Sequence, residues 1–92
     1  MIILAECEFH LYETHSLKDK RAILQRMLTR VRQQYNVSIA ETDHQDLWQR
    51  SGISIVAVAS SRTSAEREID RVLNFLMSHP GWEMTQSTKQ DL

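Results

Sequence analysis

The chain is poor in cysteine, glycine and long apolar runs, and each shortage excludes a class of protein. Its single cysteine, Cys7, cannot form an internal disulfide, which suits a reducing compartment. Two glycines, Gly52 and Gly81, are too few for a glycine-rich loop that cradles nucleotide phosphates. No apolar run approaches the roughly 20 residues that span a bilayer, and Glu6 and Glu8 interrupt the apolar start. We therefore expect a cytoplasmic domain without a cofactor or membrane contact.

Length and charge set further bounds. Ninety-two residues are enough for one domain with a single modest core. We expect that domain to occupy residues 1–86, followed by a polar, frayed tail over residues 87–92. The 11 basic and 12 acidic residues give a net charge of −1, so overall charge does not support nucleic-acid binding. Any such function requires local clustering of bases.

Four stretches have the pattern of β-strands. In the first, apolar residues alternate from Ile3 to Leu11, while the other face carries the apolar Ile2 and Leu4 and then the polar Glu6, Glu8 and His10. The third is apolar on both faces, which is typical of a strand in the middle of a sheet. The predicted strands cover residues 2–12, 37–42, 53–59 and 82–86.

Two stretches between these strands have helical spacing. The first, over residues 16–35, has Ser16 as N-cap and Asp19 three residues later. The second begins at a capping box formed by Thr63 and Glu66 and ends just before the only proline. The order βαββαβ predicts an α+β, ferredoxin-like fold with strand order 4-1-3-2 and both helices on one face.

This topology brings distant polar residues together. The first two strands are expected to run in the same direction, so the start of the first helix and the loop at residues 43–50 should share one end of the sheet. The loop is rich in acids, amides and aromatic groups, whereas a simple turn favours Gly, Pro, Asn and Ser. Its candidate partner-binding residues are Asp43, His44, Gln45, Asp46, Trp48, Gln49 and Arg50.

Trp48 has two interpretations. We expect it or the preceding Leu47 to fold under the loop and anchor it to the domain. The alternative is an exposed indole that serves as an interaction hot spot or as a platform on which a base stacks.

The first helix is the most basic part of the chain. Six bases stand there against one acid, Asp19, and the free N–H groups at a helix start also favour anions. The simpler interpretation, solvated surface residues, is preferred for Lys20 and Arg21. The candidate phosphate-contacting residues are His15, Ser16, Lys18, Lys20, Arg21, Arg26, Arg30 and Arg32.

Enzymatic interpretations are weaker. The types of His10, His15, His44, Asp43 and Asp46 suit zinc, but no metal-binding spacing is present. His44 beside two acids could act as a general base, but no nucleophile accompanies it. We therefore assign no catalytic residue and no metal ligand, and an enzyme or metal site around His15, His44 and Asp46 is the least favoured alternative.

The uncovered face of the predicted sheet is unlike that of an RNA-recognition motif. The third strand has no aromatic residue, and Phe9 falls on the apolar face. An open face that carries apolar residues would more naturally bind a second subunit. Those apolar residues are Ile2, Leu4, Val56 and Val58.

Residues 15–21 (His-Ser-Leu-Lys-Asp-Lys-Arg) and residues 37–41 and 43–50 resemble the YlxP-like family of small bacterial proteins, a family of unknown function. The likeness extends to about residue 77. It departs before residue 15, where Tyr12-Glu13-Thr14 stands in place of a frequent Pro-Gly pair. The resemblance implies a ferredoxin-like fold and no established activity. The genes of this family often lie beside those of translation and ribosome-maturation factors, so the resemblance also implies an RNA context.

These observations lead to one main hypothesis, a non-enzymatic module associated with RNA or the ribosome, which uses the first helix and the loop at residues 43–50. The alternative is a protein-interaction module that self-associates as a homo-oligomer through the open sheet face.

Overall fold

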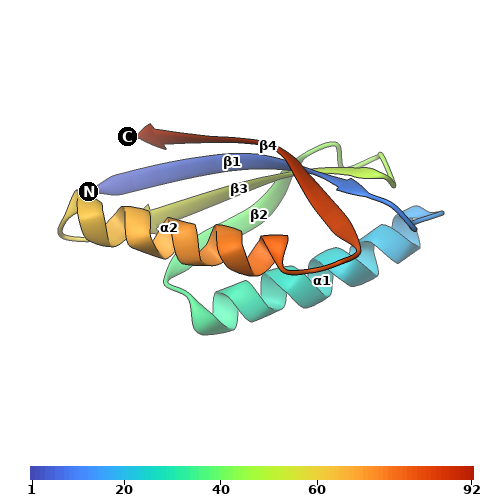
Figure 1. Cartoon of the computed structure of the whole chain (residues 1–92), viewed down its shortest axis with the longest axis horizontal. Coiled ribbons are helices and arrows are strands. Elements are labelled where there is room, and N and C mark those ends of the chain that lie inside the picture. Colours follow the sequence, from blue (N-terminus) through green and yellow to red (C-terminus); the bar gives the residue numbers. More distant parts are fainter.

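The computed structural model describes all 92 residues as a four-stranded sheet with two helices (Figure 1). The elements are β1 (Ile2–Leu11), α1 (Leu17–Gln34), β2 (Val37–Asp43), β3 (Arg50–Val58), α2 (Arg62–Met77) and β4 (Trp82–Asp91). Neither helix has the length and apolar character needed to cross a bilayer.

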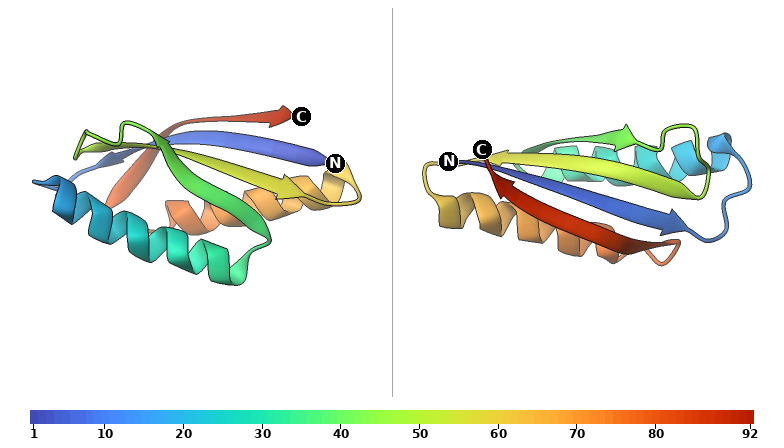
Figure 2. Two further views of the ribbon diagram at one scale, coloured as in Figure 1. Left: turned by 180° about the vertical axis from the view of Figure 1, so that it is seen from behind. Right: turned by 90° about the horizontal axis from the view of Figure 1, so that it is seen from above.

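The sheet is antiparallel throughout, with the order β2-β3-β1-β4. Both helices lie against the same face of the sheet and leave the other face uncovered (Figures 1 and 2). This arrangement confirms the predicted ferredoxin-like order 4-1-3-2. The strand that is apolar on both faces, β3, lies between β2 and β1 as predicted.

The core forms between the sheet and the helices. Odd-numbered residues of β1 from Ile3 to Leu11 are buried, while the even-numbered ones lie on the uncovered face, here called the open face. Phe9 stacks on Trp82, with 4.2 Å between ring centroids, so Phe9 lies on the covered face as expected. The helices contribute Leu24, Met27, Leu28 and Val31 from α1, and Ala65, Ile69, Val72, Leu73 and Leu76 from α2.

The starts of two elements differ from the sequence-based prediction. Strand β3 begins at Arg50 rather than residue 53, so the last residue of the predicted loop and the two residues after it pair within the sheet. Helix α2 is capped by Ser61, whose hydroxyl accepts a hydrogen bond from the backbone N–H of Ser64 at 3.2 Å. Thr63 is therefore inside the helix, and its predicted capping role is wrong.

The C-terminal strand is much longer than predicted. β4 continues to Asp91, which pairs with Ile3 of β1, so the expected frayed tail after residue 86 is wrong. A register shift in the pairing with β1 turns Lys89 and Asp91 toward the covered face, where they form ion pairs with Asp70 and Arg62 of α2. Residues 87–91 are all polar and carry no apolar alternation, which is why the sequence did not reveal this extension of the strand.

Candidate functional site

The start of α1 and the loop between β2 and β3 meet at one end of the sheet, as the topology predicted. Thr14, which is buried, donates a hydrogen bond from its hydroxyl to the carbonyl of Trp48 at 2.5 Å. The backbone N–H of Leu11 donates to the carbonyl of Gln49 at 2.9 Å. Two segments more than 30 residues apart in sequence are therefore joined directly.

Lys20 organises the loop from beneath. Its side chain is 1% exposed, and its ammonium group forms an ion pair with Glu41 at 2.8 Å. The same group donates to the carbonyl oxygens of His44 at 2.7 Å, of Arg50 at 3.0 Å, and of Leu47. A buried ammonium group is tolerated only with such partners, because its three N–H donors and its charge must all be compensated.

The prediction that Lys20 is a solvated or partner-contacting residue is therefore wrong. A sequence signal for its burial exists, because Lys20 lies four residues before Leu24 and seven before Met27, on the buried stripe of α1. Its partner Glu41 also accepts a hydrogen bond from the hydroxyl of buried Ser51 at 2.8 Å. No pattern in the sequence indicated this second contact.

The loop presents its side chains outward because several of its carbonyl groups point toward Lys20. Leu47 and Trp48 are each 42% exposed, so the expectation that one of them folds under the loop is wrong. The imidazole of His15 lies beside the indole of Trp48, with 6.2 Å between ring centroids and 66° between ring planes. The loop is therefore anchored by the polar side chains of Lys20 and Thr14, and not by an apolar side chain of its own.

The remaining basic residues of α1 are exposed, and the helix has only one acidic residue. The exposed bases are Lys18, Arg21, Arg26, Arg30 and Arg32. The one acid of the helix, Asp19, accepts a hydrogen bond from the backbone N–H of His15 at 3.1 Å, and its own N–H donates to the capping Ser16. Arg32 also donates to the carbonyl of Ile39 on the edge strand β2, at 2.9 Å.

Asp43 and His44 do not lie with Trp48 and the bases of α1; they lie over the open face of the sheet. Thr42 is an extra residue in β2, because Glu41 pairs with Ile53 whereas Asp43 pairs with Gly52. This bulge turns Asp43 away from the covered face that Ile39 and Glu41 share. A Cβ atom at Gly52 would lie only 2.6 Å from the Cβ of Asp43, so the position requires glycine.

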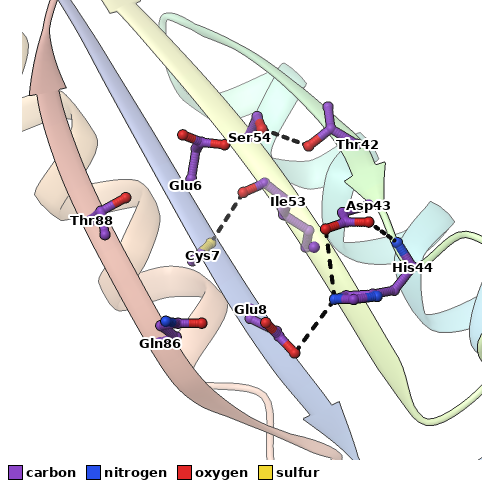
Figure 3. A pocket seen from close by; sticks show the side chains of 11 residues that line it. Glu6, Cys7, Glu8, Thr42, Asp43, His44, Ile53, Ser54, Gln86 and Thr88 are labelled. Carbon is purple, nitrogen blue, oxygen red and sulfur yellow. Dashed lines mark hydrogen bonds and ion pairs between the residues drawn. The ribbon is translucent and has the colours of Figure 1, made fainter.

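The open face carries a hollow of about 240 Å³ beside these residues (Figure 3). His44, whose φ of 59° is unusual for a non-glycine residue, places its Nε2 3.6 Å from a carboxylate oxygen of Glu8 and 3.7 Å from one of Asp43. Arg50 donates from Nε to the same Glu8 carboxylate at 2.7 Å. Burial raises the pKa of the neighbouring Cys7 thiol to about 12, so this thiol stays protonated near neutral pH.

The predicted composite site therefore divides into two surfaces. His15, Trp48 and the exposed bases of α1 lie on the helix side, whereas Asp43, His44 and Arg50 lie on the open face with Glu6 and Glu8. Sequence reasoning missed Glu6 and Glu8, although their alternation placed them on the polar face of β1. No group of three or more His, Cys, Asp or Glu side chains is placed to hold a metal ion.

The fold and this divided end of the sheet define a small ferredoxin-like α+β protein, and comparison with known proteins places it in a family. Residues 2–89 match the family described as "Protein of unknown function (DUF503)", and the chain belongs to that family. It is 53% identical over 85 residues to the "Uncharacterized protein YlxP" of Bacillus subtilis (strain 168), with 92% of each chain covered. The resemblance found in the sequence is confirmed.

A solved structure supports the fold. The protein resembles the "De novo designed protein Foldit4" with a TM-score of 0.61, covering 100% of this chain and 99% of the other. At 14% identity, this likeness concerns the architecture alone.

Proposed function

We propose that this protein is a non-enzymatic binding module for structured RNA in the cytoplasm, and that α1 supplies most of its phosphate contacts. The observation that carries the proposal is the charge of α1, where five exposed bases stand against the single acid Asp19. Since the whole chain has a net charge of −1, these bases are concentrated locally rather than being part of a generally basic protein.

The other helix provides an internal standard. Helix α2 lies on the same face of the sheet and carries three bases and three acids. Two of those bases are paired within the helix, Arg62 with Glu66 at 2.9 Å and Arg71 with Glu68 at 3.4 Å. A helix whose polar face only contacts water can have its positive and negative charges balanced by such pairs. The uncompensated bases of α1 suit an anionic partner, to which they would add a salt-sensitive term.

The loop beside α1 supplies groups of a different kind. Gln45, Asp46 and Gln49 are exposed, and their amide and carboxylate groups match the donors and acceptors on base edges better than they match phosphates. This division of labour, with bases positioning the backbone and polar groups reading bases, is usual in nucleic-acid recognition. It agrees with the RNA context that the family resemblance implies.

The test is binding to ribosomal RNA fragments and ribosomal subunits at low salt. Arg26→Glu combined with Arg30→Glu reverses two exposed charges one helical turn apart, and we expect it to weaken binding more than tenfold. The matched control is Arg67→Glu with Arg71→Glu, which makes the same change at the same spacing on α2 and should leave binding largely intact. Absence of binding, or equal effects of both pairs, would contradict the proposal.

A second candidate function, self-association, is favoured by the open face. Ile2 lies opposite Val58 and Leu4 lies opposite Val56 in the β1–β3 pairing, which forms an uncovered apolar group at one end of the sheet. If this group is an interface between two copies, sedimentation should show a dimer at high concentration that Val58→Lys abolishes. A monomer at every concentration would eliminate this candidate.

A further inference from the structure

We propose that the corner formed by Trp48 and His15 binds an unpaired base of an RNA strand whose phosphates contact the first turns of α1. This inference rests on the proposed function, because it specifies which part of an RNA the site takes. Three features support it: the exposure of the indole, the rigidity of its loop, and the position of the first exposed bases of α1.

The indole is accessible, and its backbone is fixed. Trp48 is 42% exposed, and its carbonyl accepts a hydrogen bond from the hydroxyl of buried Thr14. The carbonyl of the preceding residue, Leu47, accepts a hydrogen bond from the ammonium group of buried Lys20. A rigid aromatic ring needs little further ordering when it binds a flat partner, so more of the stacking free energy appears as affinity.

His15 makes the corner suitable for a base. Its ring stands at 66° to the indole, so the imidazole is not stacked on the indole and leaves room for another planar group. A base stacked on Trp48 would meet the edge of the imidazole, which carries one hydrogen-bond donor and one acceptor when neutral. Two aromatic groups from different segments would then contact the same base.

The first exposed bases of α1 stand where the sugar–phosphate backbone would continue. Lys18 and Arg21 follow His15 within the first turns of α1. Arg21 and Arg32 are eleven residues apart, about three helical turns, so they share one flank of the helix. Arg32 donates to the carbonyl of Ile39 in β2, which shows that this flank faces the strand leading into the loop. Stacking and phosphate contacts can therefore engage one continuous strand.

An unpaired base fits better than a duplex. Bases inside a duplex are stacked on both sides, and the major groove of A-form RNA is too narrow for side chains to read. The exposed Asp46 at the tip of the loop would repel a phosphate there but can accept a hydrogen bond from the amino group of a splayed base.

The experiment compares a short single-stranded RNA with a blunt-ended RNA duplex that has the same number of phosphates, using tryptophan fluorescence. Trp82 is buried against Phe9, so quenching by a stacked base reports on Trp48. We expect the single strand to quench the emission and the duplex to leave it unchanged. Because Trp48→Leu lacks the reporting indole, its affinity is measured by the fluorescence anisotropy of an end-labelled RNA, and the substitution should weaken single-strand binding about 5- to 100-fold. Leu47→Ala, equally exposed on the same loop, should not weaken it.

The outcomes separate this inference from the proposed function. Salt-sensitive binding of both RNAs that is unaffected by Trp48→Leu would overturn the unpaired-base site and leave the proposed function standing. Absence of binding to either RNA would overturn both. Unchanged Trp82 emission and an unchanged unfolding midpoint in Trp48→Leu would show that the variant is folded, so that a loss of affinity reports on the site.

Discussion

The two helices differ in their polar residues far more than in the way they fold. Each begins at a serine whose hydroxyl accepts from the third N–H, Ser16 for α1 and Ser61 for α2, and each buries five residues. In α2 all five are apolar and the surface charges are balanced. In α1 one of the five is Lys20, and the surface carries five bases and one acid. Since α2 shows that a helix packed on this sheet needs neither feature, the additional polar chemistry of α1 points to function.

The largest difference between the helices should come from Lys20. Lys20→Met would leave the carboxylate of Glu41 without its cation and the carbonyl groups of His44 and Arg50 without their donor. We expect a loss of about 3 kcal/mol in the free energy of unfolding, measured by urea denaturation. Lys18→Met, on the exposed side of the same helix, is the control and should change stability by less than about 0.5 kcal/mol. Similar effects of the two substitutions would refute the organising role of Lys20.

The two glycines sharpen the comparison between the loop beside α1 and the turn after α2. A Cβ at Gly52 would meet the Cβ of Asp43 at 2.6 Å, next to the backbone, so Gly52→Ala should cost about 1–3 kcal/mol and displace Asp43. A Cβ at Gly81 would meet only the ring of His79, which can rotate, and Gly81→Ala should cost less. Chemical shifts of His44 would register the first change. If Gly81→Ala is the more damaging of the two, the tight packing of the bulge is not important.

The smallest effect should be equal in the two helices. Ser16→Ala and Ser61→Ala each remove a hydroxyl that accepts one backbone N–H, at 3.1 Å and 3.2 Å respectively. We expect each to lower the unfolding free energy by about 1 kcal/mol. Thermal or urea unfolding of both variants checks this, and a markedly larger loss at Ser16 would mean that the start of α1 supports the loop through its cap as well as through Lys20.

The sequence predicted the fold well because apolar periodicity carried it. The alternation in β1, the apolar stripes of both helices and the doubly apolar β3 identified the topology and the end of the sheet at which α1 meets the loop. The second half of β4, residues 87–91, was not predicted because its pairing depends on backbone hydrogen bonds and on ion pairs such as Lys89 with Asp70. Neither produces an apolar pattern.

The candidate site was predicted in position but not in detail. One extra residue in β2, Thr42, decides that Asp43 lies on the open face, and no local pattern in the sequence indicates a bulge there. Burial of Lys20 depends on partners from residues 41–50, so only its place on the apolar stripe hinted at it. The exposure of Trp48 follows from that burial, because the loop is held by Lys20 instead of by its own aromatic residue.

The central claim, that the bases of α1 bind RNA phosphates, is tested most directly by the salt dependence of affinity for a short single-stranded RNA. We predict that the logarithm of the binding constant falls linearly with the logarithm of salt concentration, with a slope of about −0.7 for each phosphate contacted. Lys18→Gln combined with Arg21→Gln should reduce that slope by about 1.4 in magnitude. An affinity independent of salt, or a slope unchanged in the double variant, would contradict the account.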